Sequence, residues 1–256
     1  MSDKHTIARG ALPFAQRTRQ PNGIAYEVSG AGPPVVLVHG LSGSMRWWER
    51  NVPALARQFR VYVVDLAGFG ASHGQPFVLE EGARALAQWM DGLGIERASF
   101  VGHSMGGHIV ADLAADFPER VERLVLVDAA ALPLDLRTWL PSPATLVGLR
   151  HLPYRFLPIL LADSLRAGAL TIAGAFLSLL RADISVKLGA IAAPTLLVWG
   201  EHDLLVPASF GQALSQAIPG ARLVVLPNTS HNPMWERAEQ FNALVAAFLA
   251  EGQQHE

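Results

Sequence analysis

The chain has 256 residues, and with 50% hydrophobic and only 16% charged residues it can build one large domain with a sizeable core. A formal net charge of −2 and the lack of any Lys/Arg run exclude a broad electrostatic attraction to nucleic acid or to an anionic membrane. Cysteine does not occur, which excludes disulfides, thiolate metal sites and a cysteine nucleophile.

The N-terminal segment, MSDKHTIARGALPFAQ, has no apolar run followed by a small-residue cleavage site. We therefore expect no signal peptide and a cytoplasmic location. The excess of Arg over Lys, with many Ala, Gly and Leu residues, is typical of a GC-rich bacterial genome. It indicates nothing about the chemistry.

Short apolar runs alternate with longer helical stretches along most of the chain, as in a mostly parallel sheet flanked by helices. The runs are continuously Val- and Leu-rich, which is typical of parallel strands buried on both faces. The predicted strands are residues 24–28, 35–38, 61–65, 99–101, 124–127, 196–198 and 223–226. The predicted helices between them are residues 45–56, 79–93, 104–117, 208–218 and 238–249. The fold class is therefore α/β.

The alternation is interrupted once, between Asp128 and Leu196. This segment has no good strand and is rich in Leu, Ala and Pro, with predicted helices at residues 157–166 and 169–180. Its longest uncharged stretch, residues 167–180, is shorter than the ~20 residues that a membrane-spanning helix needs. We interpret the segment as an apolar lid and expect no stable membrane insertion.

The strongest local signal is the sequence Gly102-His103-Ser104-Met105-Gly106, which lies where a predicted strand ends and a helix begins. In such a turn the serine hydroxyl projects above the sheet, and a Cβ at either glycine would collide with the neighbouring chain. The following helix directs free N–H groups and a partial positive charge at the same point. An ordinary glycine-rich turn that happens to contain a serine is the alternative. The strand–helix context favours Ser104 as a nucleophile.

A serine hydroxyl is a poor nucleophile until a neighbouring base takes its proton. His231 is expected on the loop between the last strand and the last helix, at the carboxyl edge of the sheet. Alone it would be interpreted as a solvated loop histidine, but its position after Ser104 in the chain favours a general base. His103, next to Ser104, is expected to pack and to form hydrogen bonds.

The base needs an acid that holds its tautomer and stabilises the imidazolium. Asp203 follows the strand at residues 196–198 and precedes His231. Asp128 also ends a predicted strand and is a competitor. Either residue could instead cap a helix or anchor a loop. We favour Asp203.

The oxyanion that forms on attack needs two hydrogen-bond donors. The helix after Ser104 offers the backbone N–H of Met105. The loop after the strand at residues 35–38 offers the second donor, and the N–H of Leu41 is the best candidate. A simple strand-ending turn at His39-Gly40 is the alternative, and the spacing does not decide whether Ser42 or Ser44 assists.

These motifs occur in one order along the chain, and together they resemble the α/β-hydrolase superfamily from about Asn22 to the last helix. The set is His39-Gly40, Asp65-x-x-Gly68-x-Gly70-x-Ser72, Gly102-His103-Ser104-Met105-Gly106-Gly107, Gly200-x-x-Asp203 and Ser230-His231. The resemblance implies that Ser104, Asp203 and His231 form the catalytic triad. It implies that the N–H groups of Leu41 and Met105 form the oxyanion hole.

The resemblance also implies a domain organisation. An α/β-hydrolase core would comprise residues 1–130 and 188–256, and a helical cap at residues 131–187 would be inserted after the sixth strand. The loop from Asp65 to Ser72 is expected to be structural. The serine at position 104 departs from dehalogenases and epoxide hydrolases, which have aspartate there.

The expected substrate follows from the apolar cap, whose large side chains include Trp139, Tyr154, Phe156 and Phe176. Most of these side chains would form the cap's own core, and the rest would face Ser104. Trp47 and Trp48 could be core anchors or pocket walls, and we favour the core. No Arg cluster or metal-ligand set lies near the motifs, so we expect a small hydrophobic carboxylic ester as substrate, with no metal, cofactor or nucleic acid.

Other activities fit the same residues. A carbon–carbon bond hydrolase of the meta-cleavage type, a lactonase and a thioesterase can share the triad. A ligand-binding receptor and a cofactor-free oxygenase are alternatives of a different class. The sequence does not predict the oligomeric state.

Overall fold

The computed structural model describes residues 16–19, 23–133, 150 and 153–251. An eight-stranded sheet has the order β1-β2-β4-β3-β5-β6-β7-β8. The pairs β1–β2 and β2–β4 are antiparallel, whereas every other pair is parallel. The strands are β1 (Gln16–Arg19), β2 (Ala25–Ser29), β3 (Pro34–Val38), β4 (Arg60–Asp65), β5 (Ala98–His103), β6 (Val121–Val127), β7 (Thr195–Gly200) and β8 (Arg222–Leu226). The predicted α/β class with a mostly parallel sheet is confirmed.

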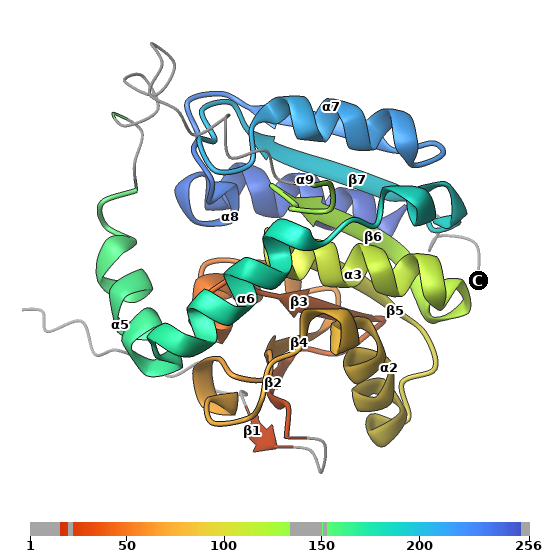
Figure 1. The fold of residues 1–256 in the computed structure, drawn as a ribbon. Coiled ribbons are helices and arrows are strands. Elements are labelled where there is room, and N and C mark those ends of the chain that lie inside the picture. The colour runs from red at the N-terminus through yellow and green to blue at the C-terminus, as the bar shows by residue number, and fades with distance from the viewer. Residues whose placement is uncertain (1–15, 20–22, 134–149, 151–152, 252–256) are drawn as a thin grey trace, which may run out of the picture.

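Helices cover both faces of the sheet (Figure 1). The α-helices are α1 (Val52–Leu55), α2 (Gly82–Leu93), α3 (Met105–Asp116), α5 (Leu157–Ala167), α6 (Ala169–Arg181), α7 (Ala208–Ala217), α8 (Pro233–Glu236) and α9 (Ala238–Ala250). One buried cluster lies between the sheet and α2, α3 and α7, and a second lies between the sheet and α1 and α9. Alternate residues of a strand serve opposite faces, so Val36 joins the first cluster and Val35 the second.

Two local predictions were incomplete. The helix predicted at residues 45–56 is divided into a 3₁₀ turn, η1 (Met45–Trp48), and the short helix α1. Asn51 occupies the break because its buried amide donates to Met234 O (2.9 Å) and Asn242 Oδ1 (2.7 Å). Strand β1 was not predicted because its sequence, QRTR, has no apolar residue.

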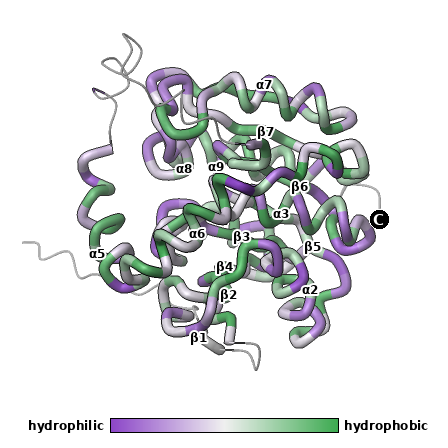
Figure 2. Tube along the Cα trace, in the orientation of Figure 1, coloured by the Kyte–Doolittle hydropathy of each residue, from purple (hydrophilic) through white to green (hydrophobic). Residues whose placement is uncertain are grey.

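Helices α5 and α6 follow β6 in the chain and precede β7, and they bend by 99° at their junction. Figure 2 shows that most of this pair is hydrophobic. No single helix in the described part of the chain is long and apolar enough to cross a membrane, although the bent pair passes that test by length and composition. Trp139 lies outside the described residues, with the rest of residues 134–149 and with residues 151–152, so the cap boundaries stay a prediction, as does the location in the cell.

Candidate active site

Ser104 lies in a strained turn between β5 and α3, with φ 52° and ψ −116°. The turn leaves no room for side chains at its glycines. A Cβ at Gly106 would lie 2.4 Å from His39 O, and a Cβ at Gly102 would lie 2.4 Å from Val110 Cγ2. The backbone C=O of Ser104 accepts from Ala130 N (3.1 Å), which ties the turn to the segment after β6. Such strain persists only where the surrounding structure enforces it.

The structure brings Ser104, His231 and Asp203 together from the carboxyl ends of three strands. His231 Nε2 lies 3.0 Å from Ser104 Oγ, and His231 Nδ1 lies 2.6 Å from Asp203 Oδ2. The other carboxylate oxygen of Asp203 accepts from the backbone N–H groups of Leu205 (2.8 Å) and Val206 (3.0 Å). The Asp203 side chain is fully buried. An imidazole held in this way can take a proton from the serine hydroxyl.

Hydrogen bonds of the His39 side chain hold the loop that follows β3. His39 Nε2 accepts from Leu66 N (3.1 Å), so Nδ1 carries the proton and donates to Gly40 O at 2.8 Å. Burial lowers the pKa of His39 to about 4, which keeps the ring neutral. The C=O and N–H of a trans peptide point in opposite directions, so the N–H of Leu41 is directed away from His39. For His39, the sequence predicted no role beyond its place in the strand-ending motif.

Leu41 lines a cavity of 220 Å³ that also exposes Ser104 and His231. Met105, the other predicted oxyanion-hole residue, is the buried first residue of α3. The remaining lining residues are mostly apolar and come from the core and from the segment of α5 and α6: Ser42, Trp47, His103, Phe156, Leu160, Phe176, Leu179, Leu205, Val206 and Asn232. Among the described residues, no Lys, Arg, Asp or Glu side chain lines it.

The aromatic residues singled out in the sequence differ in where they lie. Trp47 is buried in the core, as expected, and it also forms a wall of the cavity, where its ring packs against Phe156 at 5.0 Å between centroids. Trp48 is fully buried in the core, as expected. Tyr154, by contrast, is 70% exposed and does not line this cavity.

Asp163 supports the site from outside the cavity lining, and it was not predicted from the sequence. It is 2% exposed on α5, and its Oδ2 accepts from Ser44 Oγ (2.8 Å) and from the indole N–H of Trp47 (3.1 Å). These contacts attach α5 to the loop that carries Leu41. The only available signal was an isolated carboxylate in an apolar helix.

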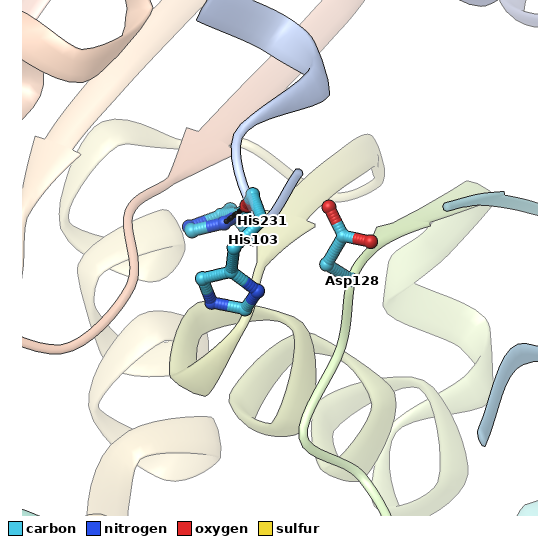
Figure 3. Close-up of side chains that lie close together, drawn as sticks. All are labelled: His103, Asp128 and His231. Carbon is cyan, nitrogen blue, oxygen red and sulfur yellow. Dashed lines mark hydrogen bonds between the residues drawn. The ribbon is translucent and has the colours of Figure 1, made fainter. Parts of the chain in front are cut away.

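Asp128, the competing acid, is fully buried at the end of β6, and its Oδ1 accepts from Gly200 N at 2.8 Å. Burial and the neighbouring Asp203 raise its pKa well above the usual range. Figure 3 shows its carboxyl group beside the imidazoles of His103 and His231. Of the two acids, Asp203 is the one in contact with His231 Nδ1.

His103 packs beneath His231, with ring centroids 4.8 Å apart, and its Nε2–H donates to His231 O at 2.7 Å. This agrees with the packing and hydrogen-bonding role that we expected. Although His103, Asp128 and His231 place ligand atoms within 4.8 Å of one another, both ring nitrogens of His231 already contact Ser104 and Asp203. A metal ion would have to displace one of those contacts.

Comparison with known proteins gives one consistent family. The model of the alpha/beta hydrolase fold family matches residues 33–187 and 168–238. A 2-hydroxy-6-oxo-6-phenylhexa-2,4-dienoate hydrolase of Burkholderia cepacia is 31% identical over 88% of this chain and 90% of its own length.

Two solved structures illustrate the range of similar folds. An enol-lactonase from Burkholderia xenovorans LB400 superposes with a TM-score of 0.77 at 29% identity, covering 92% of this chain and 100% of that one. A thermophilic esterase from Thermogutta terrifontis gives 0.76 at 27% identity, covering 93% and 99%. The chain therefore belongs to the α/β-hydrolase superfamily and is a hydrolase.

Proposed function

We propose that this hydrolase cleaves small, hydrophobic, uncharged carboxylic esters through an acyl-enzyme. The observation that carries the proposal is the cavity at Ser104, whose described lining is mostly apolar and contains no Lys, Arg, Asp or Glu side chain. An uncharged ester can enter such a cavity without leaving a charge uncompensated.

In the proposed reaction, His231 Nε2 takes the proton of Ser104 as Oγ attacks the ester carbonyl. The N–H groups of Leu41 and Met105 stabilise the resulting oxyanion. His231 then returns the proton to the departing alcohol, and Asp203 stabilises the imidazolium between these steps. Water, activated by His231, hydrolyses the acyl-enzyme.

A second candidate, hydrolysis of a carbon–carbon bond in a dienoate, is favoured by the relative from Burkholderia cepacia. The substrate in that protein's name is an anionic carboxylate. The described cavity lining offers no Lys or Arg to pair with it, and a buried carboxylate without a partner is costly. For this reason we prefer a neutral ester as the substrate. A lactone, which is a cyclic ester, would fit the same argument.

The test has two stages. A fluorophosphonate probe should label wild-type protein and leave Ser104→Ala unlabelled, which would identify the nucleophile independently of the substrate. Then kcat/KM is measured on p-nitrophenyl acetate, butyrate and octanoate and on 2-hydroxy-6-oxo-6-phenylhexa-2,4-dienoate. If Ser104 is labelled but only the dienoate is turned over, the protein would be a carbon–carbon bond hydrolase and the ester proposal would be wrong.

A further inference from the structure

Two buried carboxyl groups meet behind His231. Asp128 directly follows β6 and Asp203 follows β7, and both are almost inaccessible to solvent. Asp203 Oδ2 lies 2.6 Å from His231 Nδ1, and a carboxyl oxygen of Asp128 lies within 4.8 Å of a ring nitrogen of the same histidine, so the two carboxyl groups are neighbours. Two carboxylates cannot both keep a full charge at such a distance in a buried site, so one of them holds a proton.

The hydrogen-bond donors around each carboxyl group indicate which of the two aspartates holds the proton. Asp203 accepts from three N–H groups, those of Leu205, Val206 and His231. Asp128 accepts from one, that of Gly200. Its second oxygen, Oδ2, is buried and has no donor among the described residues. Donors stabilise the ionised form, so the charge belongs on Asp203 and the proton on Asp128.

The next question is which group accepts the hydrogen bond that protonated Asp128 donates. One candidate is Nδ1 of His103, a buried ring nitrogen without a partner among the described residues. This nitrogen lies next to Gly40, however: a Cβ added to Gly40 would be only 2.8 Å from it. The other groups that act on Asp128 are the carboxylates of Asp203 and Glu236, and both oppose its ionisation. Both carboxylate oxygens of Glu236 already accept from Ser230 and Asn232, so Asp203 is the acceptor that remains for Asp128.

We propose that Asp128 is a neutral carboxylic acid that donates a hydrogen bond to the Asp203 carboxylate, and so positions the acid of the triad. The effect of Asp128 on catalysis rests on the proposed function, in which Asp203 acts on the reaction through His231. The donated bond holds Asp203 in place and takes up part of its negative charge. Without it, Asp203 would stabilise the imidazolium form of His231 more strongly.

The backbone conformation of Asp128 determines which substitutions can test the proposal. Its φ is +43°, a conformation that asparagine and glycine tolerate and most residues do not. Asp128→Asn keeps one acceptor for Gly200 N–H and one N–H donor for Asp203, as a neutral acid does. Asp128→Gly removes both groups without straining the backbone, so the two variants form a matched pair.

The first measurement is the pH profile of kcat/KM on one neutral ester, with circular dichroism as the folding control. Asp128→Asn should stay within about twofold of wild type with the acid limb unmoved. Asp128→Gly should lose about tenfold and its acid limb should move to higher pH, because a charge-assisted hydrogen bond to Asp203 is lost.

Three outcomes of these kinetic measurements would overturn the proposal. An acid limb that moves to lower pH in Asp128→Asn would show that wild-type Asp128 carries a negative charge. An unmoved acid limb and unchanged kcat/KM in Asp128→Gly would show that it does not act through Asp203. Activity lost in Asp128→Asn to the extent seen in Asp203→Asn would make Asp128 the triad acid.

A spectroscopic readout separates this inference from the proposed function. Wild-type protein labelled with ¹³C-aspartate should show one protonated aspartic acid at neutral pH by infrared or NMR, and Asp128→Asn should lose that signal. The absence of the signal in wild type would overturn the inference even if Asp128→Gly failed to fold. Loss of fluorophosphonate labelling at Ser104 would instead contradict the proposed function and leave the signal unaffected.

Discussion

The indole N–H of Trp47 donates to the buried carboxylate of Asp163 across 3.1 Å, and this contact joins the wall of the cavity to helix α5. The same carboxylate oxygen accepts from Ser44 Oγ, on the loop that begins with His39 and Gly40. One side chain of α5 therefore holds both the cavity wall and the loop that carries Leu41.

Asp163→Ala should destabilise the protein by about 2 kcal/mol, because the indole N–H and the Ser44 hydroxyl lose their common acceptor. It should also raise KM, since Trp47 is no longer fixed. Urea denaturation and ester kinetics measure the two effects. Asp163→Asn, which keeps one acceptor oxygen, is the control and should show a smaller change in both. Equal effects of the two variants would contradict this explanation.

Ser104→Ala should fold normally and lose ester turnover, because no acyl-enzyme can form. The comparison is Ser99→Ala, which removes the hydroxyl of a buried serine within β5, outside the cavity lining, and should leave turnover intact. Turnover and fluorophosphonate labelling are followed in both variants. Wild-type turnover in Ser104→Ala would exclude the serine mechanism.

The sheet and the three central site residues could be predicted from the sequence because the evidence for them is local. Continuous apolar runs identify buried strands, and the glycines around Ser104 identify its turn. In a parallel sheet the carboxyl ends of the strands share one edge, so residues after β5, β7 and β8 converge there.

The remaining features depend on contacts between distant segments. Asp163 receives its donors from Ser44 and Trp47, which are more than a hundred residues away in the chain. The break at Asn51 depends on Asn242 in α9, and β1 is a strand because it pairs with β2. No local pattern indicates such partners, so a sequence interpretation does not reach them.

Acyl chain length should be limited by the cavity of 220 Å³, whose lining includes Phe176 and Leu179 of α6. We expect kcat/KM to be higher for butyrate and octanoate esters than for palmitate. Phe176→Ala should widen the site and move the preference toward longer chains. A wild-type preference for palmitate, with activation at an oil–water interface, would indicate a lipase instead.

His39 should contribute to acid sensitivity. Burial lowers its pKa from 6.5 to about 4. Between these values the unfolded chain binds a proton at this residue and the native chain does not, so the free energy of unfolding falls as the pH is lowered. The loss should reach about 3 kcal/mol by pH 4.

The check compares wild type with His39→Asn, whose amide can still donate to Gly40 O. The other buried histidines titrate in both proteins, so the difference between the two pH profiles isolates residue 39. The free energy of unfolding should fall less steeply for the variant between pH 6.5 and 4. Parallel profiles would show that His39 is protonated in the native protein.

Asp203→Asn tests the acid assignment directly. The variant should keep the fold but place His231 in the wrong tautomer, because an amide N–H cannot accept from Nδ1–H. In chymotrypsin-type proteases the corresponding change lowers kcat by about 10⁴-fold, or on the order of 5 kcal/mol of barrier. Asp128→Asn should retain most of the activity. Both variants are measured on one ester near neutral pH, with circular dichroism as the folding control. If Asp128→Asn were inactive and Asp203→Asn active, the acid would be Asp128, while the proposed roles of Ser104 and His231 would stand.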